Sequence, residues 1–130
     1  MSSGFIHDGY TRQGFIAAMS DEKSGQEFHP SLRFEYRPML VSARAALMRR
    51  IADLAATSEK GVIESEKVAA EAMVKQLVSW DLAGPTGPAP LNLDSMLRVE
   101  PHLSGRLFNV ITGGELGDKY EAQEQAELGN

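Results

Sequence analysis

The sequence has no cysteine among its 130 residues. Disulfide bonds, thiolate metal sites and a cysteine nucleophile are therefore excluded. Long apolar runs are also missing, because no stretch approaches the roughly 20 residues needed to span a bilayer. The first ten residues lack the basic region and the apolar core of a signal peptide. We therefore expect a cytoplasmic protein that does not contact membranes.

Catalytic signatures are missing too, since the sequence contains no Walker loop, no GxSxG elbow and no GxGxxG motif. The three histidines, His7, His29 and His102, fall in a predicted turn, a loop and a helix start, and none has a second metal ligand three or four residues away. His7 and Asp8 could form half of a catalytic triad, but a polar turn is the favoured interpretation. We expect no enzyme, no cofactor, no metal site and no catalytic residue.

The remaining acidic candidates have ordinary structural explanations. Glu64 and Glu66 could share a metal, but residues two apart point to different sides of a helix. Asp81 could belong to a site, although accepting a hydrogen bond at a helix-to-loop turn is favoured. Gly113, Gly114 and Glu115 suggest a phosphate loop, but they follow a helix, whose C-terminal end repels anions.

The net charge of -5 is unevenly distributed along the chain. Residues 115–130 contain five acidic residues and one lysine, so this tail is acidic and the rest of the chain is nearly neutral. The densest basic cluster, Arg44, Arg49 and Arg50, is interpreted as the solvated face of a helix. An acidic chain without a basic stripe argues against nucleic acid as a partner.

The first third of the chain shows strand patterns. Residues 4–18 contain GFI twice around a turn at 7–9, which predicts a short hairpin. Residues 20–31 are polar and contain Gly and Pro, which predicts a loop. In residues 32–37, apolar and charged side chains alternate, which predicts a strand with one buried face.

The rest of the chain shows helical periodicity. Helices are predicted over 40–57 and 63–80, separated by a break at 58–61, with Trp80 largely buried at the end of the second. Residues 83–90 (AGPTGPAP) predict a loop without regular structure. A short helix capped by Asn92 or Asp94 follows. A last helix over 101–112 begins at Pro101 and ends at two glycines.

These elements predict an α+β fold, with a small N-terminal antiparallel sheet (a hairpin plus one strand) followed by three to four packed helices. We expect the apolar side of strand 32–37 (Leu32, Phe34 and Tyr36) to meet that of helix 40–57 (Leu47, Ile51 and Leu54). Residues 1–114 form one domain in this prediction. Residues 115–130 form an acidic, flexible tail that is dispensable for folding.

The order of several short segments resembles that of a known group of proteins. Residues 34–39 (FEYRPM) lead into a long helix, and residues 77–82 (LVSWDL) end a second one. A proline-rich loop, residues 90–97 (PLNLDSML) and a last helix ending in VITG follow. This order, over about residues 32–113, resembles tail-assembly chaperones and tail accessory proteins of long-tailed phages and prophages. That family is mostly helical, so the N-terminal strands would be an addition.

The resemblance implies a non-enzymatic protein that binds other proteins in the host cytoplasm during virion assembly. Its partners would be the tape-measure protein and the tail-tube protein, and self-association into a homo-oligomer is compatible with it. Six methionines offer adaptable contact surface, although core packing is the commoner role of such residues. The alternative is a structural virion component, such as a connector, tail-completion or decoration protein.

Overall fold

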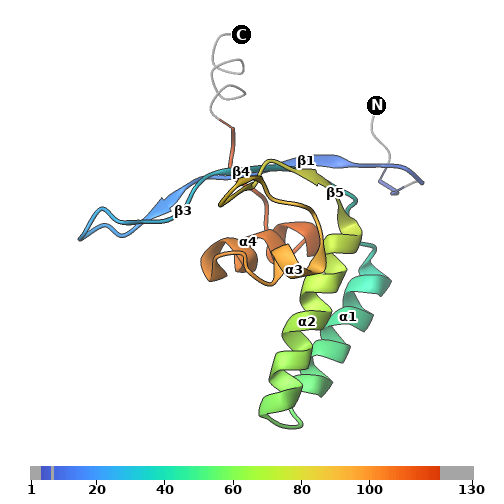
Figure 1. The fold of residues 1–130 in the computed structure, drawn as a ribbon. Coiled ribbons are helices and arrows are strands. Elements are labelled where there is room, and N and C mark those ends of the chain that lie inside the picture. The colour runs from blue at the N-terminus through green and yellow to red at the C-terminus, as the bar shows by residue number, and fades with distance from the viewer. Residues whose placement is uncertain (1–3, 7, 121–130) are drawn as a thin grey trace.

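The structure, a computed structural model, describes residues 4–6 and 8–120. It has the predicted α+β architecture, with strands gathered in a layer above the helices (Figure 1). The strands are β1 (Arg12–Ile16), β2 (Met19–Ser20), β3 (Glu27–His29), β4 (Leu32–Tyr36), β5 (Leu77–Trp80), β6 (Ala83–Gly84) and β7 (Gly87–Pro88). The helices are α1 (Val41–Ala55), α2 (Glu59–Gln76), α3 (Leu93–Met96) and α4 (Pro101–Thr112).

The main sheet is antiparallel and has the strand order β1-β4-β5. Strand β4 lies in the centre and confirms the strand predicted over 32–37. Gly14 of β1 pairs directly with Phe34 of β4. A Cβ atom on Gly14 would lie 2.4 Å from the Phe34 ring. The absence of a side chain at Gly14 therefore makes room for the Phe34 ring, which lies against β1 at this position.

The N-terminal hairpin differs from the prediction. Among the described residues of 4–18, the strand that forms is β1, and it pairs with β4; the following strand β2 pairs with β3. The turn between β2 and β3 lies at residues 21–26, where the Asp21 N–H donates to the Gln26 carbonyl at 2.8 Å. The prediction of a loop over 20–31 was wrong, because β2 and β3 form a two-stranded arm in this region. The arm projects beyond the helices, and most of its side chains are polar (Figure 1).

Helix α1 confirms the helix predicted over 40–57, but the second helix has different ends. The predicted break between the helices is present, but it lies at residues 56–58 rather than 58–61, because Ser58 caps α2 by accepting a hydrogen bond from the Gly61 N–H at 3.2 Å. At the other end the helix stops at Gln76, and residues 77–80 form β5. The predicted helix over 77–80 was wrong, because these residues supply the hydrogen-bonding partner of β4.

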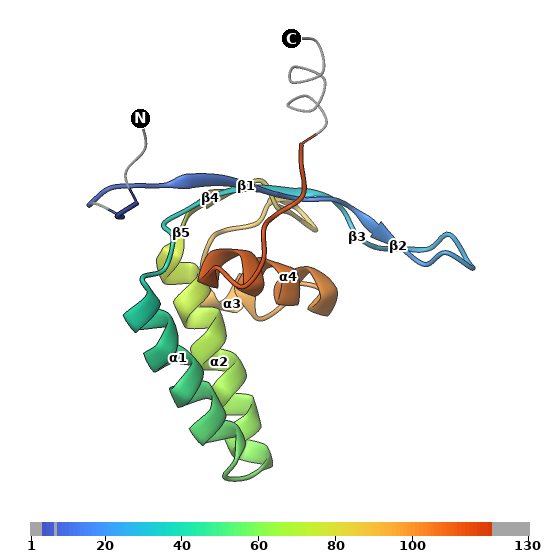
Figure 2. The same ribbon diagram turned by 180° about the vertical axis from the view of Figure 1, so that it is seen from behind.

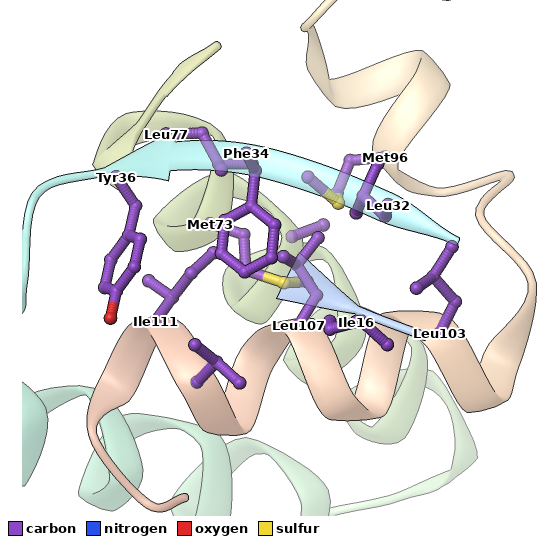
Figure 3. Packing of buried hydrophobic residues seen from close by; sticks show 12 residues of the cluster. Ile16, Leu32, Phe34, Tyr36, Met73, Leu77, Met96, Leu103, Leu107 and Ile111 are labelled. Carbon is purple, nitrogen blue, oxygen red and sulfur yellow. The ribbon is translucent and has the colours of Figure 1, made fainter. Parts of the chain in front are cut away.

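The core lies between β4 and α4, with contributions from the C-terminal part of α2 (Figure 3). Phe34 and Leu32 point from the strand toward Leu107 and Leu103 of the helix. The prediction that helix 40–57 covers the strand was wrong. Helix α1 packs along α2 instead, and none of its fifteen residues is buried in the described structure.

Of two further predictions around the sheet, the one for residues 83–90 was wrong. Residues 83–90 contain regular structure, since β6 and β7 form a small hairpin with Gly87 at a φ of 135°. Trp80 packs against the core and is mostly buried, which confirms its predicted burial. Its indole Nε1–H donates to the Ala89 carbonyl at 2.9 Å, so the tryptophan fastens this hairpin to β5.

The predicted caps of α3 and α4 are confirmed. The Asn92 side chain accepts a hydrogen bond from the Ser95 N–H at 2.9 Å. Glu100 caps α4 by accepting from the Leu103 N–H at 2.9 Å, and Pro101 occupies the first turn. Gly113 ends the helix with a left-handed φ of 88°.

Residues 115–120, here called the strap, cross β1 after α4 and continue to the open face of the sheet (Figure 2). The Asp118 N–H donates to the Phe15 carbonyl at 2.7 Å, and an Asp118 carboxylate oxygen accepts from the Ala17 N–H at 2.8 Å. The first residues of the predicted tail thus contact the body of the protein. Residues 121–130 of that tail lie outside the described part of the chain.

Candidate functional site

A groove of about 380 Å³ lies where α2, α3 and α4 meet. Most of its lining is apolar or small. The lining residues are Glu66, Ala69, Ala70, Met73, Met96, Leu97, Val99, Pro101, Ser104, Gly105 and Phe108. An exposed concave surface of this composition is typical of a binding site.

Helix α4 contributes one wall because its residues divide between two faces. Leu103, Leu107 and Val110 are buried against the sheet side. Pro101, Gly105 and Phe108 follow the spacing of the opposite side and line the groove. The Glu100 cap and the N-terminal proline fix where the helix begins, and therefore which residues face the groove.

Helix α2 contributes the opposite wall. Glu66, Ala69 and Met73 recur at spacings of three and four, which places them on one side of the helix. The same spacing leads back toward the tip of the α1–α2 hairpin, to Val62 and Ile63. These two side chains are 43% and 57% exposed, respectively. The apolar surface of the groove therefore continues along α2 beyond α3 and α4.

The groove carries one ionisable side chain among its described lining residues, Glu66. Its carboxylate makes no ion pair or hydrogen bond with the described part of the chain. The neighbouring Glu64 pairs with Lys67 at 3.8 Å on another side of the helix. The predicted separation of Glu64 and Glu66 is therefore confirmed, and the groove has a free negative charge.

Helix α1 forms a second exposed surface. Leu47, Ile51 and Leu54 are half-buried toward α2. The predicted basic cluster on this helix is exposed at Arg44, Arg49 and Arg50. None of these arginines forms an ion pair with a described residue.

The strap is held by a second set of polar contacts. Arg106 of α4 donates to Glu115 at 3.2 Å and to Asp118 at 2.7 Å. The hydrogen bond from Arg106, and then that from the Ala17 N–H, lower the pKa of Asp118. On the open face of the sheet, the rings of Phe15 and Tyr120 meet edge to face with centroids 5.2 Å apart. These contacts fix the strap to both the helix layer and the sheet.

The two histidines that the structure describes, His29 and His102, do not form a metal site. His7 lies outside the described residues. His29 is buried in the arm, with Nδ1 2.8 Å from the Pro30 carbonyl oxygen and Nε2 without a described partner. His102 stacks on Phe28 at the start of α4. Within residues 4–6 and 8–120, no three metal-binding side chains of the usual types come together.

Asp81 lies on the sheet rather than after a helix. One of its oxygens accepts a hydrogen bond from the Arg33 N–H at 2.8 Å, and the other lies 3.3 Å from the Arg33 Nε. The expected role of accepting a hydrogen bond is confirmed, but the donor belongs to β4. Asp81 thus extends the pairing of β4 with β5.

Sequence reasoning missed the groove. The signal that could have indicated it is Gly105, a glycine in the middle of an otherwise regular helical pattern. Comparison with protein-family models, curated proteins and solved structures finds no match to this chain. Among the described helices, none has the length and apolar character required to cross a membrane.

Proposed function

We propose that this chain is a non-enzymatic protein-binding protein that acts in phage tail assembly as a chaperone or accessory protein. The groove between α2, α3 and α4 carries the proposal. Its lining is mainly apolar, and its apolar surface continues along α2 to the exposed Val62 and Ile63. Extended apolar surface of this kind marks sites of protein contact.

The composition of the groove favours a protein over a small molecule. Small-molecule sites combine an apolar pocket with several polar groups that fix the orientation of the ligand. Among the described lining residues, Glu66 and Ser104 are the polar side chains. A long apolar strip with so few orienting groups suits a segment of polypeptide better than a metabolite.

The phage assignment rests on the resemblance over residues 32–113. The segments that carry it are distant in sequence and meet in one core, at Phe34 of β4, Leu77 of β5, Met96 of α3 and Ile111 of α4. The proposed partners are the tape-measure and tail-tube proteins.

The alternative, a structural virion component, is favoured by a different observation. The β2–β3 arm and the α1–α2 hairpin both project from the core (Figure 1). Projections of this kind suit a subunit that contacts neighbours in a particle. Self-association belongs to this alternative as well.

Two measurements separate these proposals. The chain is co-expressed with the tape-measure protein and with the tail-tube protein of the same genome, and complexes are isolated by affinity purification. Purified virions are then analysed by mass spectrometry. A chaperone is expected to co-purify with a partner and to be absent from virions. A fixed copy number in virions would favour the structural alternative, and the absence of both results would contradict the tail-assembly proposal.

A further inference from the structure

Gly105 lies in the interior of α4, where no contact or backbone angle within the described chain requires a glycine. A Cβ atom built at this position would meet no atom within 4 Å other than the neighbouring backbone of its own helix. Its φ is not among the positive values found at Gly9, Gly25, Gly87 and Gly113. Glycine lowers the stability of a helix interior relative to alanine, because it has more backbone freedom to lose. Neither packing nor backbone geometry within the described chain therefore requires a glycine here.

The position of Gly105 suggests that a bound molecule accounts for the glycine. The residue lies on the groove wall beside Phe108, opposite the small side chains of Ala69 and Ala70. The absence of a side chain allows another backbone to approach α4 closely, which is one of the established uses of glycine. Because the distance between packed helices depends on the side chains at the contact, a helix is well suited to this position.

The charge of the groove narrows the occupant further. Glu66 is exposed and has no partner in the described chain, and no cation is among the described residues of the lining. A carboxylate beside an apolar strip is complementary to a lysine or arginine at the edge of an apolar helix face. From Ile63 to Met73 the strip is about 15 Å long, at 1.5 Å per residue, which matches about three helical turns.

We propose that the groove receives an amphipathic α-helix of the partner protein, which crosses α4 at Gly105 and pairs a basic side chain with Glu66. The inference rests on the proposed protein-binding function and specifies the chemistry of the bound segment. The apolar face of that segment carries small residues where it meets Gly105. This is the groove mode of helix recognition, in which residues at helical spacing fill an apolar channel.

The probe for this proposal is a synthetic 14-residue helical peptide with alanine and leucine on one face and lysines beside it. Its counterpart carries glutamates in place of the lysines. Binding to the full chain is measured by fluorescence polarisation. The lysine peptide is expected to bind at least tenfold more tightly, because Glu66 attracts one sign of charge. No binding of the lysine peptide, or equal binding of both peptides, would overturn the proposal.

Gly105→Leu tests the crossing point. Leucine is a stronger helix former than glycine, and a Cβ atom at this position meets no neighbouring element, so the melting temperature is expected to rise by about 3–5 °C. Peptide binding is expected to fall at least tenfold because the side chain fills the groove. The matched control is Asn109→Leu, an exposed position of α4 outside the groove. Unchanged binding by Gly105→Leu, or an equal loss in the control, would overturn the crossing at α4.

Glu66→Lys tests the charge. It is expected to weaken binding of the lysine peptide and to strengthen binding of the glutamate peptide, whereas Glu71→Lys, exposed on another side of α2, should change neither. Co-purification with the tape-measure protein distinguishes failure of the groove proposal from failure of the proposed function. If wild type and Gly105→Leu capture that protein equally, the groove proposal fails while the proposed function stands. If wild type captures neither tail protein, the proposed function fails.

A second copy of this chain is the competing occupant, because α1 is itself basic and exposed. Sedimentation velocity over a range of concentrations decides between the two. The partner proposal expects no self-association through the groove. Oligomers that are dissolved by both Gly105→Leu and Arg49→Glu would show that α1 of another copy occupies it, and would overturn the assignment to a partner protein.

Discussion

Helices α1 and α4 are both amphipathic, but α4 is the more apolar of the two and their environments differ. Five of the twelve residues of α4 are buried, whereas α1 has fifteen residues and none of them is buried in the described structure. Helix α4 lies under the sheet, and α1 packs mainly against α2 (Figure 2). Periodicity therefore indicates that a helix has an apolar side, but the environment of that side depends on the tertiary arrangement.

The largest expected effect comes from truncating matched leucines on the two helices. Leu107→Ala in α4 should lower the free energy of unfolding by about 2–5 kcal/mol, because Leu107 is buried in the core. Leu47→Ala in α1 should cost about 1 kcal/mol, since Leu47 is half-buried and alanine is a good helix former. Urea unfolding of both variants provides the comparison. Equal losses would show that α1 is as much a part of the core as α4.

A smaller effect is expected from removing the strap, which ties α4 to the sheet. Deleting residues 115–130 removes the Asp118 and Tyr120 contacts with β1 and should cost about 1–3 kcal/mol. Deleting residues 121–130 is the control, because it leaves these contacts in place. Thermal unfolding of both truncated proteins measures the difference. If neither deletion lowers the stability, the sequence-based prediction that residues 115–130 are dispensable is confirmed.

The smallest expected effect depends on pH. The hydrogen bond from Arg106, followed by that from the Ala17 N–H, lowers the pKa of Asp118 in the folded protein. Its stabilisation is therefore fully present above the unfolded pKa of about 4 and is lost as the pH falls through the lower, folded pKa. Asp118→Asn should cost about 1 kcal/mol at pH 7, a value reduced for the partial exposure of the pair.

The difference between wild type and Asp118→Asn should shrink when unfolding is measured near pH 3. A difference that stays constant from pH 7 to pH 3 would show that the carboxylate charge does not hold the strap. Asp94→Asn is a suitable control, because Asp94 forms an exposed pair with Arg98 on α3.

The sequence allowed the local structure to be predicted where one signal dominated. Alternation along residues 32–36 identified β4, and Asn92, Pro101 and Gly113 identified the helix ends. The end of α2 was missed because apolar spacing continues through Leu77 and Trp80, although these residues pair with β4. The arm was missed because exposed strands contain the same polar residues as loops.

The groove could not be predicted from periodicity, because it depends on which helices meet. Ala69 and Met73 recur at helical spacing in α2, but this spacing does not indicate that α3 and α4 cover only part of that side of the helix. Gly105 was the local clue. An interior glycine contradicts the helical propensity around it, and such contradictions are expected at functional positions.

The strap also has a consequence for biosynthesis. Ala17 and Asp118 are hydrogen-bonded across 101 positions of sequence. Chains emerge from the ribosome at roughly 5–20 residues per second, so β1 is available for several seconds before Asp118 is made. During that interval its outer edge is uncovered at Phe15 and Ala17, and an uncovered strand edge is a template for pairing with other chains. A nascent chain stalled before residue 115 is therefore the form in which we expect aggregation to begin.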